Sequence, residues 1–365
     1  EGWSGGQKAY QLELQDGRYT ITLPQNEGTI NFKFTQGTWS SVECDKKGFA
    51  IENRSYTFGS KPDTLKLKIV GWDNLFDVEN ASTVTKQVTI LSDTFNMPQL
   101  NRKRRVWLYL PADYKTSNQS YPVVYMHDGQ NLFDKKTSSY SNEWSVDETL
   151  DKLFRNKNLK LIVVGIDNGA DKRLDEYSPF KNEKYGGGEG DAYLEFIVNT
   201  LKPYIDANYN TLKDKKHTAI FGSSMGGLIS HYAALKYPNV FGKIGVYSPA
   251  FWFAPEIENY TKSHANLKDT KMYFLAGGKE GEKAGFDEIS QTVKDMNQMI
   301  SVLKNNGFSA ENIRSKVVPD GKHNETLWRE NFEEAITWLF QDAIKTREFV
   351  YASFNNNELN VKVSD

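Results

Sequence analysis

Short, almost wholly apolar segments alternate with longer helix-like segments through most of this 365-residue chain. The strand-like segments cover residues 105–110, 122–126, 160–166, 217–221, 244–247, 272–276 and 313–318. The helix-like segments cover residues 145–155, 191–209, 225–237, 289–305 and 324–344. Apolar strands that alternate with helices are typical of a mostly parallel sheet with helices on both faces. The alternation therefore predicts an α/β domain, which we place over residues 83–365.

The first 82 residues follow a different pattern. Segments 19–23, 30–34 and 65–69 carry apolar side chains at every second position, and Gly, Pro and Asn residues lie between them. A period of two residues is the pattern of a half-buried strand. We therefore expect a small all-β sandwich over residues 1–82, ahead of the α/β domain.

Charge and composition exclude several classes of partner. The net charge is −2 and the pI is about 6.3, which does not favour nucleic acid. We interpret the short basic run 103–105 as a solvated strand entrance, and no apolar run approaches the roughly 20 residues that span a bilayer. Cys44 is the single cysteine, so no intrachain disulfide can form. The chain begins at Glu1 without a methionine, and we expect a secreted or periplasmic protein whose signal peptide is not in the given sequence.

The pattern G-x-S-x-G occurs twice in the chain. The first match, residues 2–6, has no strand before it and no helix after it. The second match, Gly222–Gly226, follows the strand-like segment 217–221 and precedes a helical run. This context is that of a nucleophile elbow, a tight turn that lifts a serine hydroxyl above the sheet at the positive end of a helix. Ser224 is therefore the predicted nucleophile, because Ser223 has the wrong spacing to the flanking glycines.

A serine hydroxyl is a poor nucleophile until a neighbouring base takes its proton. Of the five histidines, His323 directly follows the last predicted strand and precedes the last predicted helix. Active sites in open α/β sheets lie at the carboxyl ends of the strands. His127 lies upstream of the elbow, His217 begins a strand, His231 lies within a helix and His264 lies in a polar loop. His323 is therefore the predicted base.

The imidazole needs a carboxylate that holds its tautomer, and the chain order in α/β-hydrolases is serine, acid, histidine. Between the serine and the histidine, the strand-like segment 271–278 stands out, and Glu280 lies just beyond it. We favour Glu280 as the acid. Glu282, Asp287 and Asp320 are the alternatives.

Acyl transfer also needs fixed N–H groups that stabilise the developing oxyanion, each contributing about 3–4 kcal/mol. One should be the backbone amide of Met225, directly after the nucleophile. The other should come from the loop 127–131, where Gly129 lets the backbone turn toward the substrate. We favour the amide of Gln130 and place that of Gly129 second.

The chain shows no signature of a metal or cofactor site. No H-E-x-x-H pair occurs, the histidines are dispersed, and no G-x-x-x-x-G-K-[ST] phosphate loop is found. We therefore predict no metal ligands and no cofactor.

Four stretches of the second domain carry a family resemblance, and they are Arg105–Pro111, Tyr125–Phe133, Gly222–Gly227 and Gly321–Glu325. On these, residues from about 88 to 345 resemble the putative-esterase family of α/β-hydrolases. That family includes esterase D, enterochelin (siderophore) esterases, and carbohydrate esterases of the feruloyl and acetyl-xylan type.

The resemblance implies an α/β-hydrolase fold and a serine–acid–histidine triad without metal. The matching positions are Ser224, Glu280 and His323, and the acid of this family varies between Asp and Glu. The resemblance also implies substrate-binding residues near the mouth of the site, at Gly129, Trp144, Arg173 and Trp252.

The first domain is similar, more weakly, to starch-binding-like β-sandwich modules. The similarity rests on Phe32–Phe34, Gly37–Trp39 and Glu52–Tyr56. It implies a carbohydrate-binding domain, although the paired tryptophans of such modules are not obvious, and Trp39 and Trp72 could be core residues. The alternative is a spacer that packs on the catalytic domain and shapes its cleft.

These observations predict a serine carboxylic ester hydrolase that works through an acyl-enzyme. We expect the substrate to be an acyl or feruloyl ester of a carbohydrate, since flat aromatic rings stack on sugars and the chain has 8 Trp, 19 Tyr and 21 Phe. A catechol-siderophore ester is the alternative substrate. A carbohydrate-binding protein with an inactive hydrolase domain and an enzyme that transfers the acyl group to a sugar are alternative functions.

Overall fold

The computed structural model describes residues 8–24, 27–37, 41–46, 51, 54–72, 75, 82–139, 142–264, 267, 269–280, 290–344, 351–355 and 358–362. Contacts within the chain divide it into two compact units, Glu1–Ser82 and Thr83–Asp365.

The first unit contains short antiparallel strand pairs. β1 pairs with β2, β3 with β5, and β4 with β6. Their bounds are β1 Glu13–Gln15, β2 Arg18–Thr20, β3 Thr29–Phe32, β4 Glu43–Cys44, β5 Arg54–Thr57 and β6 Gly71–Trp72. The predicted strand over 65–69 is wrong, because this stretch joins no sheet and its Leu65 and Leu67 are exposed. The carbonyl of Lys68 accepts a hydrogen bond from the Arg54 guanidinium (3.0 Å).

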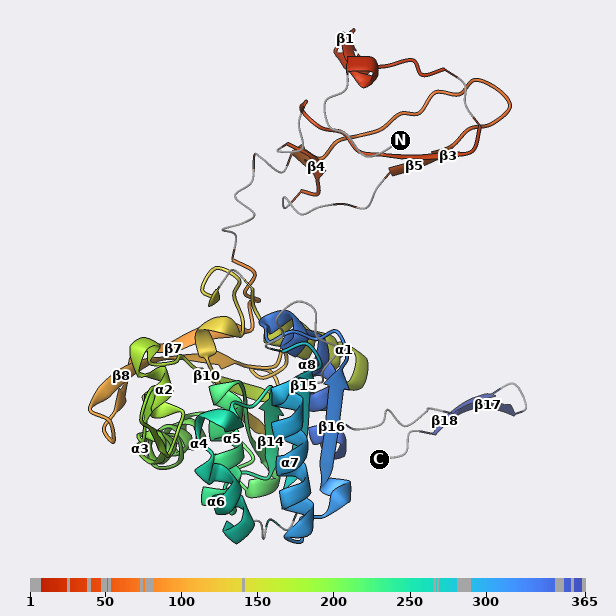
Figure 1. The fold of residues 1–365 in the computed structure, drawn as a ribbon. Coiled ribbons are helices and arrows are strands. Elements are labelled where there is room, and N and C mark those ends of the chain that lie inside the picture. Colours follow the sequence, from red (N-terminus) through yellow and green to blue (C-terminus); the bar gives the residue numbers. More distant parts are fainter. Residues whose placement is uncertain are drawn as a thin grey trace. The chain divides into compact units, whose positions relative to one another are not determined.

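The second unit is built on one eight-stranded sheet of order β16-β15-β14-β13-β9-β10-β8-β7 (Figure 1). Six neighbouring strands are parallel, and β8 and β7 complete one edge in antiparallel pairing. The predicted mostly parallel sheet is therefore confirmed. The strands are β7 Val88–Met97, β8 Arg102–Tyr109, β9 Val123–His127, β10 Ile162–Ile166, β13 Thr218–Ser223, β14 Lys243–Tyr247, β15 Lys271–Gly277 and β16 Ile313–Val318.

Helices cover both faces of this sheet, as the sequence predicted. Along β9, Val123 and Tyr125 belong to one apolar cluster, and Val124 and Met126 belong to the other. The first cluster contains residues of α3 to α7, and the second contains residues of α1 and α8. The helices are α1 Val146–Lys157, α2 Arg173–Glu176, α3 Gly190–Phe196, α4 Lys202–Asn208, α5 Met225–Lys236, α6 Glu256–His264, α7 Gln291–Asn305 and α8 Glu325–Leu339.

Two further strand pairs lie outside the main sheet, with β11 Lys181–Asn182 beside β12 Gly186–Gly187 and β17 Tyr351–Asn355 beside β18 Glu358–Lys362. Within the part of the chain that the structure describes, no helix has both the length and the apolar character needed to cross a membrane.

Candidate active site

Ser224 stands alone between the end of β13 and the first residue of α5. Its backbone angles, φ 58° and ψ −120°, lie where side chains other than glycine are strained. The turn is tight, since a Cβ at Gly222 would lie 2.8 Å from the backbone of Gly226. The amide of Ser224 donates to the carbonyl of Tyr247 (2.9 Å), and its own carbonyl accepts from the amide of Ala250 (3.1 Å). Backbone hydrogen bonds at both its amide and its carbonyl therefore hold the serine in the strained turn.

Glu280 and His323 meet at the carboxyl ends of β15 and β16. The carboxylate Oε2 of Glu280 lies 2.9 Å from Nδ1 of His323. The other oxygen, Oε1, accepts from the amide of Gly277 (2.7 Å) and the hydroxyl of Ser248 (2.6 Å), and the carboxylate is buried. The indole N–H of Trp328 donates to the Ser248 hydroxyl oxygen (2.9 Å). The acid is thus fixed on both oxygens, and an imidazole that donates from Nδ1 keeps its lone pair on Nε2.

The alternative acids differ from Glu280 in their surroundings. Asp320 is exposed and pairs with Lys279 (2.6 Å). Glu282 and Asp287 lie outside the described residues. Among the carboxylates that the structure places, Glu280 is the one bonded to His323.

The other four histidines have structural positions. His127 and His231 are fully buried, and burial lowers the pKa of each to about 3, so both stay neutral. His217 precedes β13 at the amino end of that strand, and His264 is the last residue of α6.

The two predicted oxyanion donors lie at the starts of helical turns. Met225 is the first residue of α5, so its N–H has no helical carbonyl to bond. This N–H lies at the positive end of the helix dipole. Gln130 lies in the 3₁₀ turn Gly129–Asn131 after β9, and its side-chain oxygen accepts from the amide of Asn168 (3.1 Å). A Cβ at Gly129 would lie 2.8 Å from backbone atoms of Ile166 in β10, so this position needs glycine.

Arg173 holds the loop that carries Gln130. Its guanidinium binds the Asp128 carboxylate in two places, Nε to Oδ1 (2.7 Å) and Nη2 to Oδ2 (2.9 Å). Burial opposes ionisation of Asp128, but the attraction of Arg173 and its hydrogen bonds outweigh burial and lower the pKa of the carboxyl group. The Asn168 side chain donates to the same carboxylate (2.7 Å). The guanidinium of Arg173 is therefore occupied by Asp128, the residue directly before the turn at Gly129.

The two predicted tryptophans have opposite surroundings. Trp144 is 3% exposed and stacks on Tyr247 with ring centroids 5.6 Å apart, so it belongs to the core beneath the site. Trp252 is 56% exposed, and its ring meets the exposed ring of Tyr185 edge to face at 5.8 Å. Of the pair, only Trp252 offers a broad aromatic surface.

Sequence reasoning missed Ser248 and Trp328, which hold Glu280 from behind. Ser248 directly follows β14 and has a positive φ of 43°, but its sequence surroundings carry no recognisable motif. Trp328 lies in the first turn of α8, five residues after His323, where a tryptophan on an apolar helix face predicts only a core position.

The sheet topology and the strained serine between β13 and α5 define an α/β-hydrolase. Residues 97–339 match the family model described as Putative esterase, and the chain belongs to that family. It is a carboxylic ester hydrolase.

Individual relatives span most of the second unit. The chain is 31% identical over 245 residues to the uncharacterized protein YbbA of Bacillus subtilis. The aligned region covers 65% of this chain and 92% of YbbA. It is 26% identical over 261 residues to an endo-1,4-beta-xylanase/feruloyl esterase of Xylanibacter ruminicola, 70% of this chain and 31% of the relative. The solved enterobactin esterase of Shigella flexneri shares the fold, with a TM-score of 0.55 and 19% identity over 72% of this chain and 60% of that one.

Proposed function

We propose that Ser224, Glu280 and His323 form the catalytic triad of this esterase. His323 takes the hydroxyl proton as Ser224 attacks the ester carbonyl, and the alcohol leaves as a covalent acyl-enzyme forms. Water, activated by the same imidazole, then releases the acid. The observation that carries the proposal is the hydrogen bond between Glu280 and His323 (2.9 Å), in a chain whose strained elbow serine precedes both in the expected order.

The amides of Met225 and Gln130 complete the proposed site as oxyanion donors. Met225 contributes an N–H at the start of α5, and Gln130 one from the turn after β9. Asp128 and Arg173 support this turn, so we assign Arg173 a positioning role. Gly129 allows the close approach of the turn to β10, and Trp144 supports the site from the core.

Replacement of the nucleophile tests the triad. We expect Ser224→Ala to lower kcat for a short-chain p-nitrophenyl ester by at least about 10³-fold, since the triad acts as a unit. Ser223→Ala is the matched control, because Ser223 ends β13 and should leave most activity. A fluorophosphonate probe should label the wild type and not Ser224→Ala. Unchanged hydrolysis by Ser224→Ala would overturn the assignment.

We propose an acyl or feruloyl ester of a carbohydrate as the natural substrate. The feruloyl esterase relative from Xylanibacter ruminicola supports this class, and the exposed rings of Trp252 and Tyr185 are suited to stack on a sugar or a phenolic acid. A polysaccharide substrate is too large to cross a membrane, and we propose a secreted or periplasmic location on that ground.

A substrate panel separates the classes. Methyl ferulate, feruloylated arabinoxylan, acetylated xylan and enterobactin should be compared by kcat/KM, with Ser224→Ala as the blank. We expect the carbohydrate esters to lead. A preference for enterobactin would instead favour siderophore hydrolysis, which the shared fold with the enterobactin esterase supports. Acylation of an added free sugar, with release of the donor alcohol, would reveal acyl transfer.

The first unit is proposed as a glycan-binding module. Its strand pairs suit a small sandwich, and Trp72 lies half-buried in β6, while Trp39 lies outside the described residues. Binding of the full chain to insoluble xylan or starch, compared with Trp72→Ala, tests the module. Glycan binding without fluorophosphonate labelling of the wild type would favour a binding protein with an inactive hydrolase domain.

A further inference from the structure

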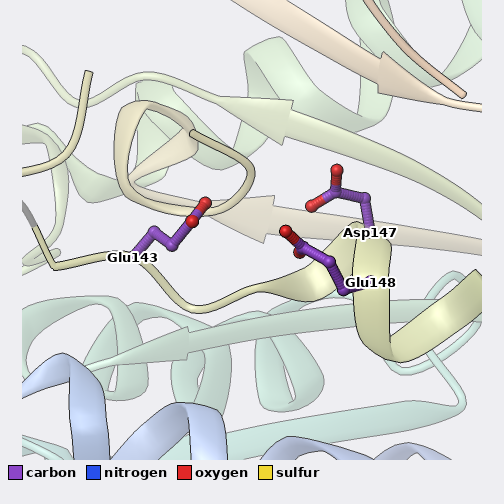
Figure 2. A group of neighbouring side chains, drawn as sticks. All are labelled: Glu143, Asp147 and Glu148. Atoms are coloured by element: carbon purple, nitrogen blue, oxygen red, sulfur yellow. The ribbon is translucent and has the colours of Figure 1, made fainter. Parts of the chain in front are cut away.

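Three carboxylates gather outside the proposed active site. Glu143 lies just before α1, and Asp147 and Glu148 lie in the first turn of that helix. One carboxylate oxygen from each lies within 4.8 Å of the other two. The three carboxyl groups point into one shared space, from the loop on one side and from the helix on the other (Figure 2). We call these three residues the α1 acid cluster.

Three oxygens of the α1 acid cluster have no hydrogen-bond donor except a proton shared within the cluster, between the side chains of Asp147 and Glu148. They are Oε2 of Glu143, Oδ1 of Asp147 and Oε2 of Glu148, and all three atoms are buried. The residues Glu143 and Asp147 are only 5% and 0% exposed. Buried polar atoms without partners are rare and costly in native proteins, so the unpartnered Oε2 of Glu143, beside the Asp147–Glu148 pair, indicates a missing ligand.

The remaining oxygens of two of these residues fix the carboxylates in place. Oε1 of Glu143 accepts from the hydroxyl of Thr83 (2.5 Å), and Oδ2 of Asp147 accepts from the amide of Thr85 (2.7 Å). Each of these carboxylates therefore uses one oxygen to bind the segment that begins the second unit. The other oxygen of each is available to a ligand, as in a preformed site.

The electrostatics of the α1 acid cluster require a positive counterpart. Burial raises the pKa of Glu143 to about 7, and burial together with the charge of Asp147 raises that of Glu148 to about 9. In the described part of the chain, no lysine or arginine forms an ion pair with any of the three. The guanidinium of Arg329 instead donates to the backbone carbonyl of Glu143 (3.1 Å). Either protons or a bound cation must therefore relieve the repulsion.

We propose that Glu143, Asp147 and Glu148 bind a structural Ca²⁺ ion. An all-oxygen, carboxylate-rich ligand set suits a hard divalent cation. Ca²⁺ binds oxygens at about 2.3–2.6 Å, so two ligands of one ion can lie up to about 5 Å apart, whereas Mg²⁺ ligands lie within about 4.2 Å of each other. The three ligand atoms lie within 4.8 Å of one another, so one Ca²⁺ ion can reach all of them, and a buried set of protein oxygens suits Ca²⁺ better than Mg²⁺, which gives up its waters reluctantly. The buried hydroxyl oxygen of Thr85 is a further oxygen next to Asp147.

The ion would join three segments of the second unit. Thr83 and Thr85 already bind Glu143 and Asp147, so the ion would connect residues 83–85 with the loop before α1 and with α1 itself. Trp144, next to Glu143, packs on Trp328 with ring centroids 5.5 Å apart. The ion would therefore stabilise the core behind the proposed triad and would take no part in the chemistry, and it would be a metal site that the sequence did not predict.

Full-length wild-type protein tests the site directly. After treatment with EDTA and its removal, Ca²⁺ should raise Tm by about 5–10 °C at a hundredfold excess over Kd, and Mg²⁺ should raise it much less. Tb³⁺, which replaces Ca²⁺ in oxygen sites, should bind with one-to-one stoichiometry and give luminescence excited through Trp144. Excess Ca²⁺ should abolish that signal. Neither readout depends on ester hydrolysis, so the outcome is separate from that of the proposed triad.

Matched variants locate the ion. Glu143→Gln with Glu148→Gln should remove the Tb³⁺ signal and the Tm response, whereas Glu311→Gln, at an exposed carboxylate, should keep both. If the double variant does not fold, the wild-type titrations still decide. Wild-type protein at pH 8 that shows no Tb³⁺ luminescence and no Tm response to Ca²⁺ would overturn the proposal and indicate that protons hold the cluster.

Discussion

At the scale of single residues, the acid of the proposed triad is the most constrained side chain of the site. Glu280 receives three donors, from His323, Gly277 and Ser248. We expect Glu280→Gln to lower kcat by about 10³–10⁴-fold with little change in KM, since an amide cannot stabilise the imidazolium and favours the wrong tautomer. Asp320→Asn is the matched control and should stay near wild-type activity. Comparable losses in the two variants would remove Glu280 from the triad.

Trp328 is expected to act through Glu280. Its indole donates to Ser248, which in turn donates to Glu280. Trp328→Phe keeps the ring and removes the donor, so kcat should fall by about fivefold to tenfold with KM unchanged. Trp338→Phe, on the same helix, is the control. A change in KM alone, or equal effects of the two variants, would contradict a positioning role.

The local motif made Ser224 predictable, since the glycines and the flanking strand and helix lie next to it in the sequence. The support of Glu280 was not predictable, because Ser248 and Trp328 reach it only through the tertiary fold. The same limit applies to Trp144. Its aromatic identity suited a site mouth equally well, and only packing against Tyr247 places it in the core.

At the scale of elements, the start of α8 sets the position of His323. Asn324 caps this helix, and its side chain accepts from the amide of Leu327 (3.2 Å). Asn324→Ala should lower the free energy of unfolding by about 1 kcal/mol and reduce kcat severalfold, because the residue before the cap carries the imidazole. Asn324→Ser keeps a capping oxygen and should restore both. Denaturant unfolding and steady-state kinetics measure the two effects, and an Asn324→Ser variant as impaired as Asn324→Ala would contradict the capping role.

Elements with strong apolar patterns were predicted well, and weakly patterned ones were not. The helix predicted over 225–237 is α5, which ends at Lys236 and is buried over most of its length. Helix α6 was missed because only Ile257 and Thr261 of its nine residues are buried. The predicted helix over 191–209 contains a π-helical segment, Ile197–Leu201, between α3 and α4, which apolar periodicity does not reveal.

At the scale of the whole molecule, stability should depend on pH through the α1 acid cluster. Glu143 and Glu148 have raised pKa values of about 7 and 9, and Asp147, Asp134 and Arg329 are the charged groups that act on them. A raised folded-state pKa favours folding below the unfolded value of a carboxyl group, and this contribution is lost as pH rises through the folded value. Without Ca²⁺, the free energy of unfolding should therefore fall between about pH 5 and pH 9.

Bound Ca²⁺ neutralises the ionised carboxylates, so the loss of stability should disappear when the site is filled. The difference in Tm between samples with Ca²⁺ and with EDTA should accordingly grow from pH 5 to pH 9. Other titrating groups affect both samples equally and cancel in the difference. The Glu143→Gln and Glu148→Gln double variant should give a difference near zero at every pH. A wild-type difference that is constant across this range would show that any Ca²⁺ effect arises at carboxylates other than Glu143 and Glu148.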